Sequence, residues 1–303
     1  MWPFDVKQRV DAINDAAVQG RSLWDDARAR LLRNRAAVAS MIILGLLVVV
    51  AIIGALGIWV HDYDTINEDY VRVPPTLENW HILGTDQQGR DLLARTMVGL
   101  GISLMVGVVA TAVLLVIGVV YGAVAGFVGG RVDQVMMRLV DVLYSVPFIF
   151  FVIILTVAFG RNIFLIFFAI GAVEWLTMAR IVRGQTLSLR KMEFVEAAEA
   201  AGATRWEIIR RHIIPNVLGP VVVYVTLMIP VVILAESFLS FLGLGVQEPL
   251  TSLGRLIALG KDNIEIADLR HTLLVPAITM MVTLFALNFI GDGLRDAIDP
   301  KDR

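Results

Sequence analysis

Long apolar runs alternate with polar segments along the whole chain. An α-helix rises about 1.5 Å per residue, so about 20 apolar residues cross the hydrocarbon core of a bilayer. The pattern predicts an all-α integral membrane protein with six transmembrane helices. Pro147 marks a kink site in the third span, and Pro230 lies in the middle of the fifth. The expected spans are 36–60, 101–128, 136–159, 163–178, 218–242 and 272–290.

The segment before the first span is polar and basic. Residues 22–35 predict an amphipathic helix on the inner membrane surface, because Leu23, Ala27 and Leu31 share one face and arginines occupy the others. A solvated helix without membrane contact is the alternative. The chain is therefore divided into a cytoplasmic N-terminal segment and a transmembrane domain, at 1–35 and 36–303.

One stretch between the fourth and fifth spans, Lys191–Pro220, is too polar to cross a bilayer. Glu196, Ala197 and Ala198 lie in a run of strong helix formers. Gly202 is expected to end this first helix, because glycine tolerates the left-handed conformation of a C-terminal cap. The stretch is therefore expected to begin as a short helix that stops at a glycine corner.

A second short helix is expected after the corner. Thr204 followed by Glu207 indicates a capping box that begins it, and Pro215 is expected to end it. Exposed cations beside a flat alanine surface are typical of a docking site for another protein. A basic loop that only orients the protein in the membrane is the alternative. The side chains expected to project from the second helix are Arg205, Arg210, Arg211 and His212, and the expected apolar anchors are Trp206, Ile208, Ile209 and Ile213.

Lysine and arginine are unevenly divided between the two sides of the membrane that six spans define. Nineteen lie in the terminal segments, in the turn after the second span and in the region around the Lys191–Pro220 loop, against seven in the three opposite loops. Positive residues concentrate on the cytoplasmic side of membrane proteins. Both termini and the loop are therefore expected in the cytoplasm, in a multi-pass protein surrounded by membrane lipid. The net charge of −2 indicates no nucleic-acid partner.

Glycines recur at intervals of four in the second span. Gly118, Gly122 and Gly126 form one stripe on a helix, and Gly130 continues the interval. Such a stripe lets a neighbouring helix approach closely in lipid. The neighbour belongs either to this chain or to a partner, and the general tolerance of membrane helices for glycine is the alternative reading.

The residue inventory favours a protein that is not an enzyme. The chain has no cysteine, which excludes disulfides and thiolate metal sites. Its four histidines show no metalloprotease spacing, and the sequence contains neither a Walker lysine motif nor a serine-nucleophile motif. We therefore expect no catalytic residue, no cofactor and no metal, which argues against an integral membrane enzyme. Any ATP hydrolysis must come from another chain.

Glu236 lies in the fifth apolar run, where an ionisable side chain is a functional candidate. Two roles are open, contact with a translocation path or pairing with a partner helix. Arg138 and Asp141 are expected to pair along the third span. A carrier driven by an ion gradient would need an inverted repeat and a series of buried acids. The sequence shows neither clearly, so this alternative is weaker.

Several stretches resemble the membrane subunits of ABC importers, above all the peptide and nickel branch and its oligopeptide permease C subunits. Glu196-Ala197-Ala198, with Gly202 and Pro215, resembles the EAA signature of these subunits. His212 departs from the general pattern, but a basic-His-apolar run is common in that branch. The other resembling stretches are GRSLWDDARARLLRNRAAVAS (20–40), HILGTDQQGRDLLAR (81–95), MARIVRGQTLSL (178–189), SFLGLGVQEP (240–249) and GDGLRDAIDPKDR (291–303).

The resemblance implies a type I ABC-importer permease fold with a cytoplasmic EAA coupling-helix loop. It implies a subunit of the bacterial inner membrane that forms half of a pathway for oligopeptides, with dipeptides, glutathione or nickel complexes as alternatives. The implied partners are a second homologous permease, two cytoplasmic ABC ATPase subunits that receive the loop in a groove, and a periplasmic peptide-binding protein. The segment 81–95 would face that binding protein or cap the cavity. The implied ATPase-coupling residues are Glu196, Ala197, Ala198, Gly202, Arg205, Trp206, Arg210 and Pro215.

Overall fold

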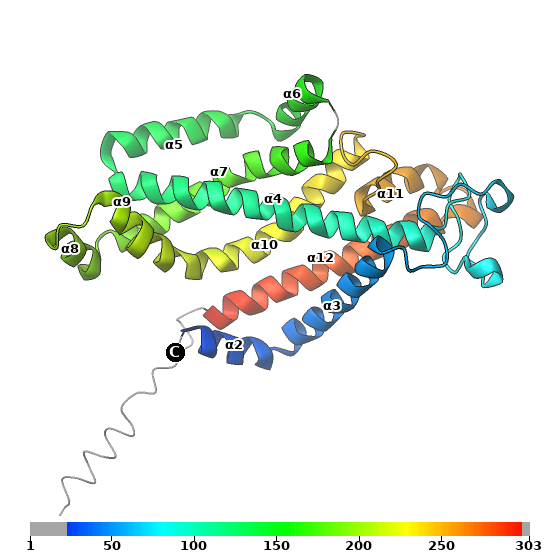
Figure 1. The fold of residues 1–303 in the computed structure, drawn as a ribbon, viewed down its shortest axis with the longest axis horizontal. Helices are drawn as coiled ribbons and strands as arrows, with labels where there is room; N and C mark the ends of the chain where they lie inside the picture. Colours follow the sequence, from blue (N-terminus) through cyan, green and yellow to red (C-terminus); the bar gives the residue numbers. More distant parts are fainter. Residues whose placement is uncertain (1–22, 161, 299–303) are drawn as a thin grey trace, which may run out of the picture.

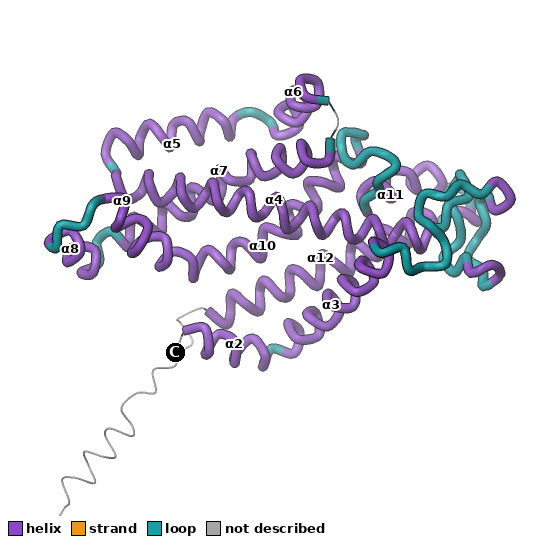
Figure 2. The backbone as a smooth tube through the Cα atoms, viewed as in Figure 1, coloured by secondary structure: helices purple, strands orange, loops and turns teal. Residues whose placement is uncertain are grey.

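The computed structural model describes residues 23–160 and 162–298, which form helices and loops without an extended sheet. Figure 2 shows how little of the described chain is loop, and the predicted all-α fold is confirmed. The α-helices are α2 (Leu23–Arg33), α3 (Arg35–Ala55), α4 (Leu92–Val128), α5 (Gly130–Ser145), α6 (Phe148–Phe159), α7 (Ile163–Leu189), α8 (Glu193–Ala200), α9 (Arg205–Ile208), α10 (Ile214–Phe241), α11 (Leu253–Gly260) and α12 (His271–Ile298). The shorter elements are the 3₁₀ turns η1 (Glu68–Tyr70), η2 (Glu78–Trp80), η4 (Lys261–Asn263) and η5 (Ala267–Leu269), and the π-helical η3 (Ile209–Ile213).

The long helices run in roughly one direction, and α4 lies between the others (Figure 1). α4 packs against α7 most extensively, and it also contacts α3 and α10. α8 and α9 lie at one end of the molecule, whereas the loop between α3 and α4 lies at the other, near α11. Five described helices are long and apolar enough to cross a membrane, and α5 with α6 supplies a sixth span if this bent pair is counted as one.

Several helices end at different places from the apolar runs that predicted them. α4 begins at Leu92 rather than at 101, because the Asp91 side chain accepts a hydrogen bond from the Ala94 amide and caps the helix. α7 and α12 also extend past their predicted ends, whereas α3 ends earlier, at Ala55. Hydropathy marks the part of a helix that suits lipid, and the backbone ladder can continue through polar turns beyond it.

The third apolar run does not form one continuous helix. The expected span 136–159 is replaced by α5 and α6, which meet at an angle of 84°. Pro147 has no amide hydrogen to donate, and it forces the preceding residue, Val146, into extended backbone with ψ at 121°. Pro147 is thus a break rather than a kink, while α10 continues through Pro230.

Two ion pairs fasten α5 to α7. Arg183 donates to Asp133 through both Nε and Nη2, with a distance of 2.6 Å from Nη2 to Oδ2. Arg180 Nη2 lies 2.9 Å from Asp141 Oδ1. The expected pairing of Asp141 with Arg138 along one helix was therefore wrong, because a neighbouring helix supplies the cation.

The helix predicted near the N-terminus is present as α2. It ends at Arg33, and the side chain of the next residue, Asn34, accepts hydrogen bonds from two amides of α3 and so begins the next helix. Ala27 on its apolar face is buried, and Leu31 lies beside Gly293 of α12. Part of that face therefore packs on the protein itself rather than on lipid. The earlier part of the predicted N-terminal segment lies outside the described residues.

Candidate functional site

The polar loop begins with α8, which contains Glu196, Ala197 and Ala198. Val195 is buried and joins the main apolar core. Glu196 and Ala197 are exposed, and Ala198 is half-buried. α8 therefore rests on the protein by one side and presents the other side to the surroundings.

Gly202 ends this first helix in the left-handed region, with φ at 82°. Its amide donates to the Glu199 carbonyl at 3.0 Å, and the next amide, that of Ala203, donates to the Ala198 carbonyl at 3.1 Å. This pair of bonds is a Schellman motif, and the predicted glycine cap is confirmed. No heavy atom lies within 4 Å of the place where a Cβ would stand. The need for glycine is therefore one of backbone conformation, not of space.

The predicted capping box begins the second helix and is also confirmed. The Glu207 amide donates to Thr204 Oγ1 at 3.3 Å, and Glu207 Oε2 accepts from the Thr204 amide at 2.9 Å. The bonds from the backbone and side chain of Thr204 hold the pKa of the Glu207 carboxyl below its usual range. α9 consequently starts at a fixed position three residues after the glycine corner.

The second helix does not end at Pro215, contrary to the sequence prediction. α9 passes into the π-helical η3 and then into α10, so that one helical rod runs from Arg205 to Phe241. Pro215 directly follows the π-helical η3, in which the Ile214 amide donates to the Ile209 carbonyl, so the missing proline amide falls where the α-helical hydrogen-bond ladder is already shifted. The short helix of the loop is therefore the end of a membrane-spanning helix.

At the loop, one side of the rod is apolar and packs on the protein (its base), and the opposite side is mostly polar and exposed (its outer face). Trp206 is 55% exposed on that outer face, so the prediction that it anchors the helix was wrong. The buried residues that anchor the base are Ile208, Ile209 and Ile213. The exposed residues beside Trp206 are Arg205, Arg210 and Arg211, with Pro215 exposed one turn further on.

The glycine stripe of α4 faces α7 of the same chain. A Cβ at Gly118 or Gly126 would lie within 3 Å of α7 atoms, and a Cβ at Gly122 would collide with the Ala179 carbonyl oxygen. The glycines thus permit the close approach of these two helices. Gly130 does not continue the stripe, because it begins α5 and has open space around it.

Glu236 is completely buried within the chain. Its Oε1 accepts hydrogen bonds from Ser240 Oγ at 2.6 Å and Ser252 Oγ at 2.7 Å, and its Oε2 lies 3.5 Å from Ser103 Oγ. Ser103 belongs to α4 and Ser252 caps α11. The carboxyl therefore ties α4, α10 and the start of α11 together, and its contact with a translocation path stays a prediction.

Replacing this carboxyl separates the effect of shape from that of hydrogen bonding. Glu236→Leu is expected to destabilise the fold by about 1–3 kcal/mol, because buried serine hydroxyls lose their acceptor. Glu236→Gln keeps an acceptor oxygen and is expected to cost less. Thermal unfolding of the purified variants measures the difference, and equal midpoints for leucine and glutamine would contradict this role.

Comparison with known proteins places the chain in a family. Residues 118–303 match the model of the binding-protein-dependent transport system inner membrane component. The chain belongs to this family of transport permeases. Residues 22–75 match a second model, the N-terminal transmembrane domain of oligopeptide transport permease C.

Two relatives of this permease family resemble the chain over nearly their whole length. It is 52% identical over 298 residues to the oligopeptide transport system permease protein OppC of Haemophilus influenzae, covering 98% of this chain and 95% of the relative. It is 55% identical over 286 residues to OppC of Escherichia coli K12, covering 94% of each. Among solved structures, the inward-facing MetNI methionine ABC transporter has a similar fold, with a TM-score of 0.50, 21% identity and coverage of 69% of this chain and 96% of that one.

The serine partners of Glu236 were not predicted from the permease sequence. Ser240 lies four residues after Glu236, which places both on one side of α10, so helical spacing alone could have indicated it. Ser103 and Ser252 are distant in sequence, and serine is common in membrane helices, so nothing local marks them.

Proposed function

We propose that this chain is one permease subunit of an ATP-driven importer of oligopeptides in the bacterial inner membrane. The observation that carries the proposal is its 52–55% identity to OppC proteins across nearly all of both chains. The chain forms half of the pathway, and a second, homologous permease forms the other half. It hydrolyses no ATP itself, and two cytoplasmic ABC ATPase subunits supply the energy.

The loop from α8 to α9 is the point at which that energy enters. Its apolar base is anchored in the core, while Glu196, Arg205 and Arg210 are exposed. In the proposed mechanism Glu196 pairs with a basic residue of the ATPase, and Gly202 sets the angle between α8 and α9. Ala197, Ala198, Trp206 and Pro215 complete the docking surface.

Because the rod is continuous, α10 is the helix that carries motion of the loop into the membrane. Because α9, η3 and α10 form one helix from Arg205 to Phe241, a displacement of the docked loop moves the membrane-spanning part of α10 directly. No break at Pro215 absorbs the motion. Glu236 then couples this movement to α4 and α11 through its serine contacts.

The proposed orientation places the loop and both termini in the cytoplasm. Its support is the concentration of lysine and arginine on that side, nineteen against seven. The opposite end, with the loop between α3 and α4, then faces the periplasm and a peptide-binding protein. Segment 81–95 contacts that protein or caps the cavity, and the bound protein sets much of the peptide selectivity.

Reconstitution into liposomes tests this function. The chain with its second permease, the ATPase pair and the binding protein is expected to import oligopeptides only when ATP is inside. Dipeptides, glutathione and nickel complexes serve as competing substrates, and a preference for one of them would replace the oligopeptide assignment. Vanadate-insensitive uptake by the chain alone, driven by a proton gradient, would contradict the whole proposal.

A further inference from the structure

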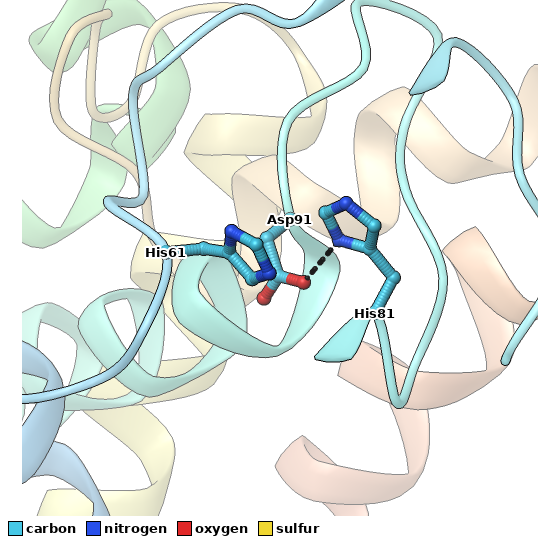
Figure 3. A group of neighbouring side chains, drawn as sticks. All are labelled: His61, His81 and Asp91. Carbon is cyan, nitrogen blue, oxygen red and sulfur yellow. Dashed lines mark hydrogen bonds and ion pairs between the residues drawn. The ribbon is translucent and has the colours of Figure 1, made fainter. Parts of the chain in front are cut away.

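Two histidines and an aspartate meet in the loop between α3 and α4 (Figure 3). His61 follows α3, His81 follows η2, and Asp91 caps α4. Their ligating atoms, one ring nitrogen from each histidine and one carboxylate oxygen, all lie within 4.8 Å of one another. The three residues come from separate parts of the loop, so no spacing motif in the sequence could reveal them.

The Asp91 carboxylate is fixed in orientation by two separate hydrogen bonds. Its Oδ1 accepts from the Ala94 amide at 2.8 Å as the cap of α4, and its Oδ2 lies 2.9 Å from His81 Nδ1. Asp91 and His81 are 2% and 3% exposed. One carboxylate oxygen and one imidazole nitrogen are therefore held side by side in a buried site, with little freedom to turn away.

The backbone that carries His81 is strained. Asn79 and Trp80, the two residues before it, have φ values of 53° and 63°, a region that non-glycine residues seldom occupy. Such conformations persist where the surrounding structure enforces them, often at ligand sites. The Asn79 carbonyl lies 2.8 Å from His61 Nε2, and the Asn79 side chain donates to Tyr70 Oη at 2.6 Å. The strained turn thus holds both histidines at the cluster.

We propose that His61, His81 and Asp91 form a binding site for a divalent transition metal of the zinc type. Two imidazoles with one carboxylate are a ligand set that zinc accepts at about 2.0–2.2 Å, with water in the fourth position. Magnesium and calcium prefer sites made of oxygen alone, so they fit this set poorly. The metal would join the segment after α3 to the first turn of α4.

His61 is the ligand that moves on metal binding. Its ring is stacked on that of His81, with centroids 4.3 Å apart and planes 14° from parallel. One ion cannot lie in the planes of two stacked rings, so one ring must rotate. His61 is the half-buried member and gives up one contact, that with the Asn79 carbonyl. His81 and Asp91 are buried and stay in place.

Titration of the full-length chain in lipid nanodiscs with Zn²⁺, or with Co²⁺ as a visible probe, tests the site. One ion per chain is expected to bind, and His61→Gln is expected to weaken binding at least tenfold. Asp91→Asn should do the same while keeping α4 capped, because asparagine caps a helix as well as aspartate. His271→Gln is the matched control, since this histidine contacts the Thr85 carbonyl outside the cluster.

Two results would overturn the site. The first is the absence of stoichiometric zinc binding to the wild-type chain. The second is binding that survives both His61→Gln and Asp91→Asn, which identifies an adventitious metal only. Size-exclusion chromatography of each variant confirms folding, and His61→Gln leaves the buried pair of His81 with Asp91 intact. The assignment does not depend on the transported substrate.

Discussion

The Gly202→Val variant is expected to assemble into a complex whose ATPase subunits still bind ATP, yet that complex is expected to import peptide at no more than about a tenth of the wild-type rate. Gly202 has φ at 82°, which a β-branched residue adopts only under severe strain. The corner must then re-form at another angle between α8 and α9. A displacement that raises the barrier to transport by about 1.4 kcal/mol lowers the rate about tenfold. Uptake and ATPase activity of the reconstituted complex measure the uncoupling.

A matched glycine separates this effect from that of added bulk. Gly219 of α10 also has no heavy atom within 4 Å of a Cβ position, but its φ is not positive. Gly219→Val is therefore expected to transport normally. Wild-type import by Gly202→Val would show that the angle of the corner does not control transport.

Gly122→Val is expected to destabilise the folded chain by about 3 kcal/mol or more, at the upper end of overpacking effects. Its Cβ would collide with the Ala179 carbonyl oxygen and lie 2.9 Å from the Arg183 amide nitrogen. These are backbone atoms of α7, so no side chain can turn aside to make room. α4 and α7 must separate, and they form the most extensive helix contact of the fold.

Thermal unfolding of the purified variant measures this loss. Gly184→Val, on α7 but with open space at its Cβ position, is the control and is expected to unfold near the wild-type temperature. A Gly122→Val midpoint equal to that of the control would contradict tight packing of α4 on α7.

Short-range sequence patterns predicted the structure of the α8–α9 loop well. Gly202 as a left-handed cap and Thr204 with Glu207 as a capping box depend on residues only a few positions apart, and both are present. The apolar runs likewise predicted the helices, because lipid demands apolar side chains over a fixed length. Features that depend on distant contacts were not predicted. The cation that pairs with Asp141 comes from α7, and the partners of Glu236 include Ser103 of α4.

Proline was interpreted wrongly twice, for one physical reason. Pro147 breaks the third apolar run, whereas Pro215 interrupts nothing. Proline removes one amide donor and restricts the residue before it. Whether that ends a helix depends on the turn in which proline falls. Pro215 lies in the first turn of α10, next to a π-helical segment, and the sequence does not reveal that register.

Cross-linking is the most direct test of whether the ATPase docks at the α8–α9 loop. The chain has no cysteine, so a single introduced thiol is unique in it. Ala201→Cys, exposed at the glycine corner, is expected to cross-link to the ATPase subunit in assembled complexes. Leu77→Cys, 84% exposed in the loop between α3 and α4, is expected not to, because that loop lies at the opposite end of the molecule. Cross-linking of the ATPase from residue 77 but not from residue 201 would show that the ATPase does not dock at the α8–α9 loop.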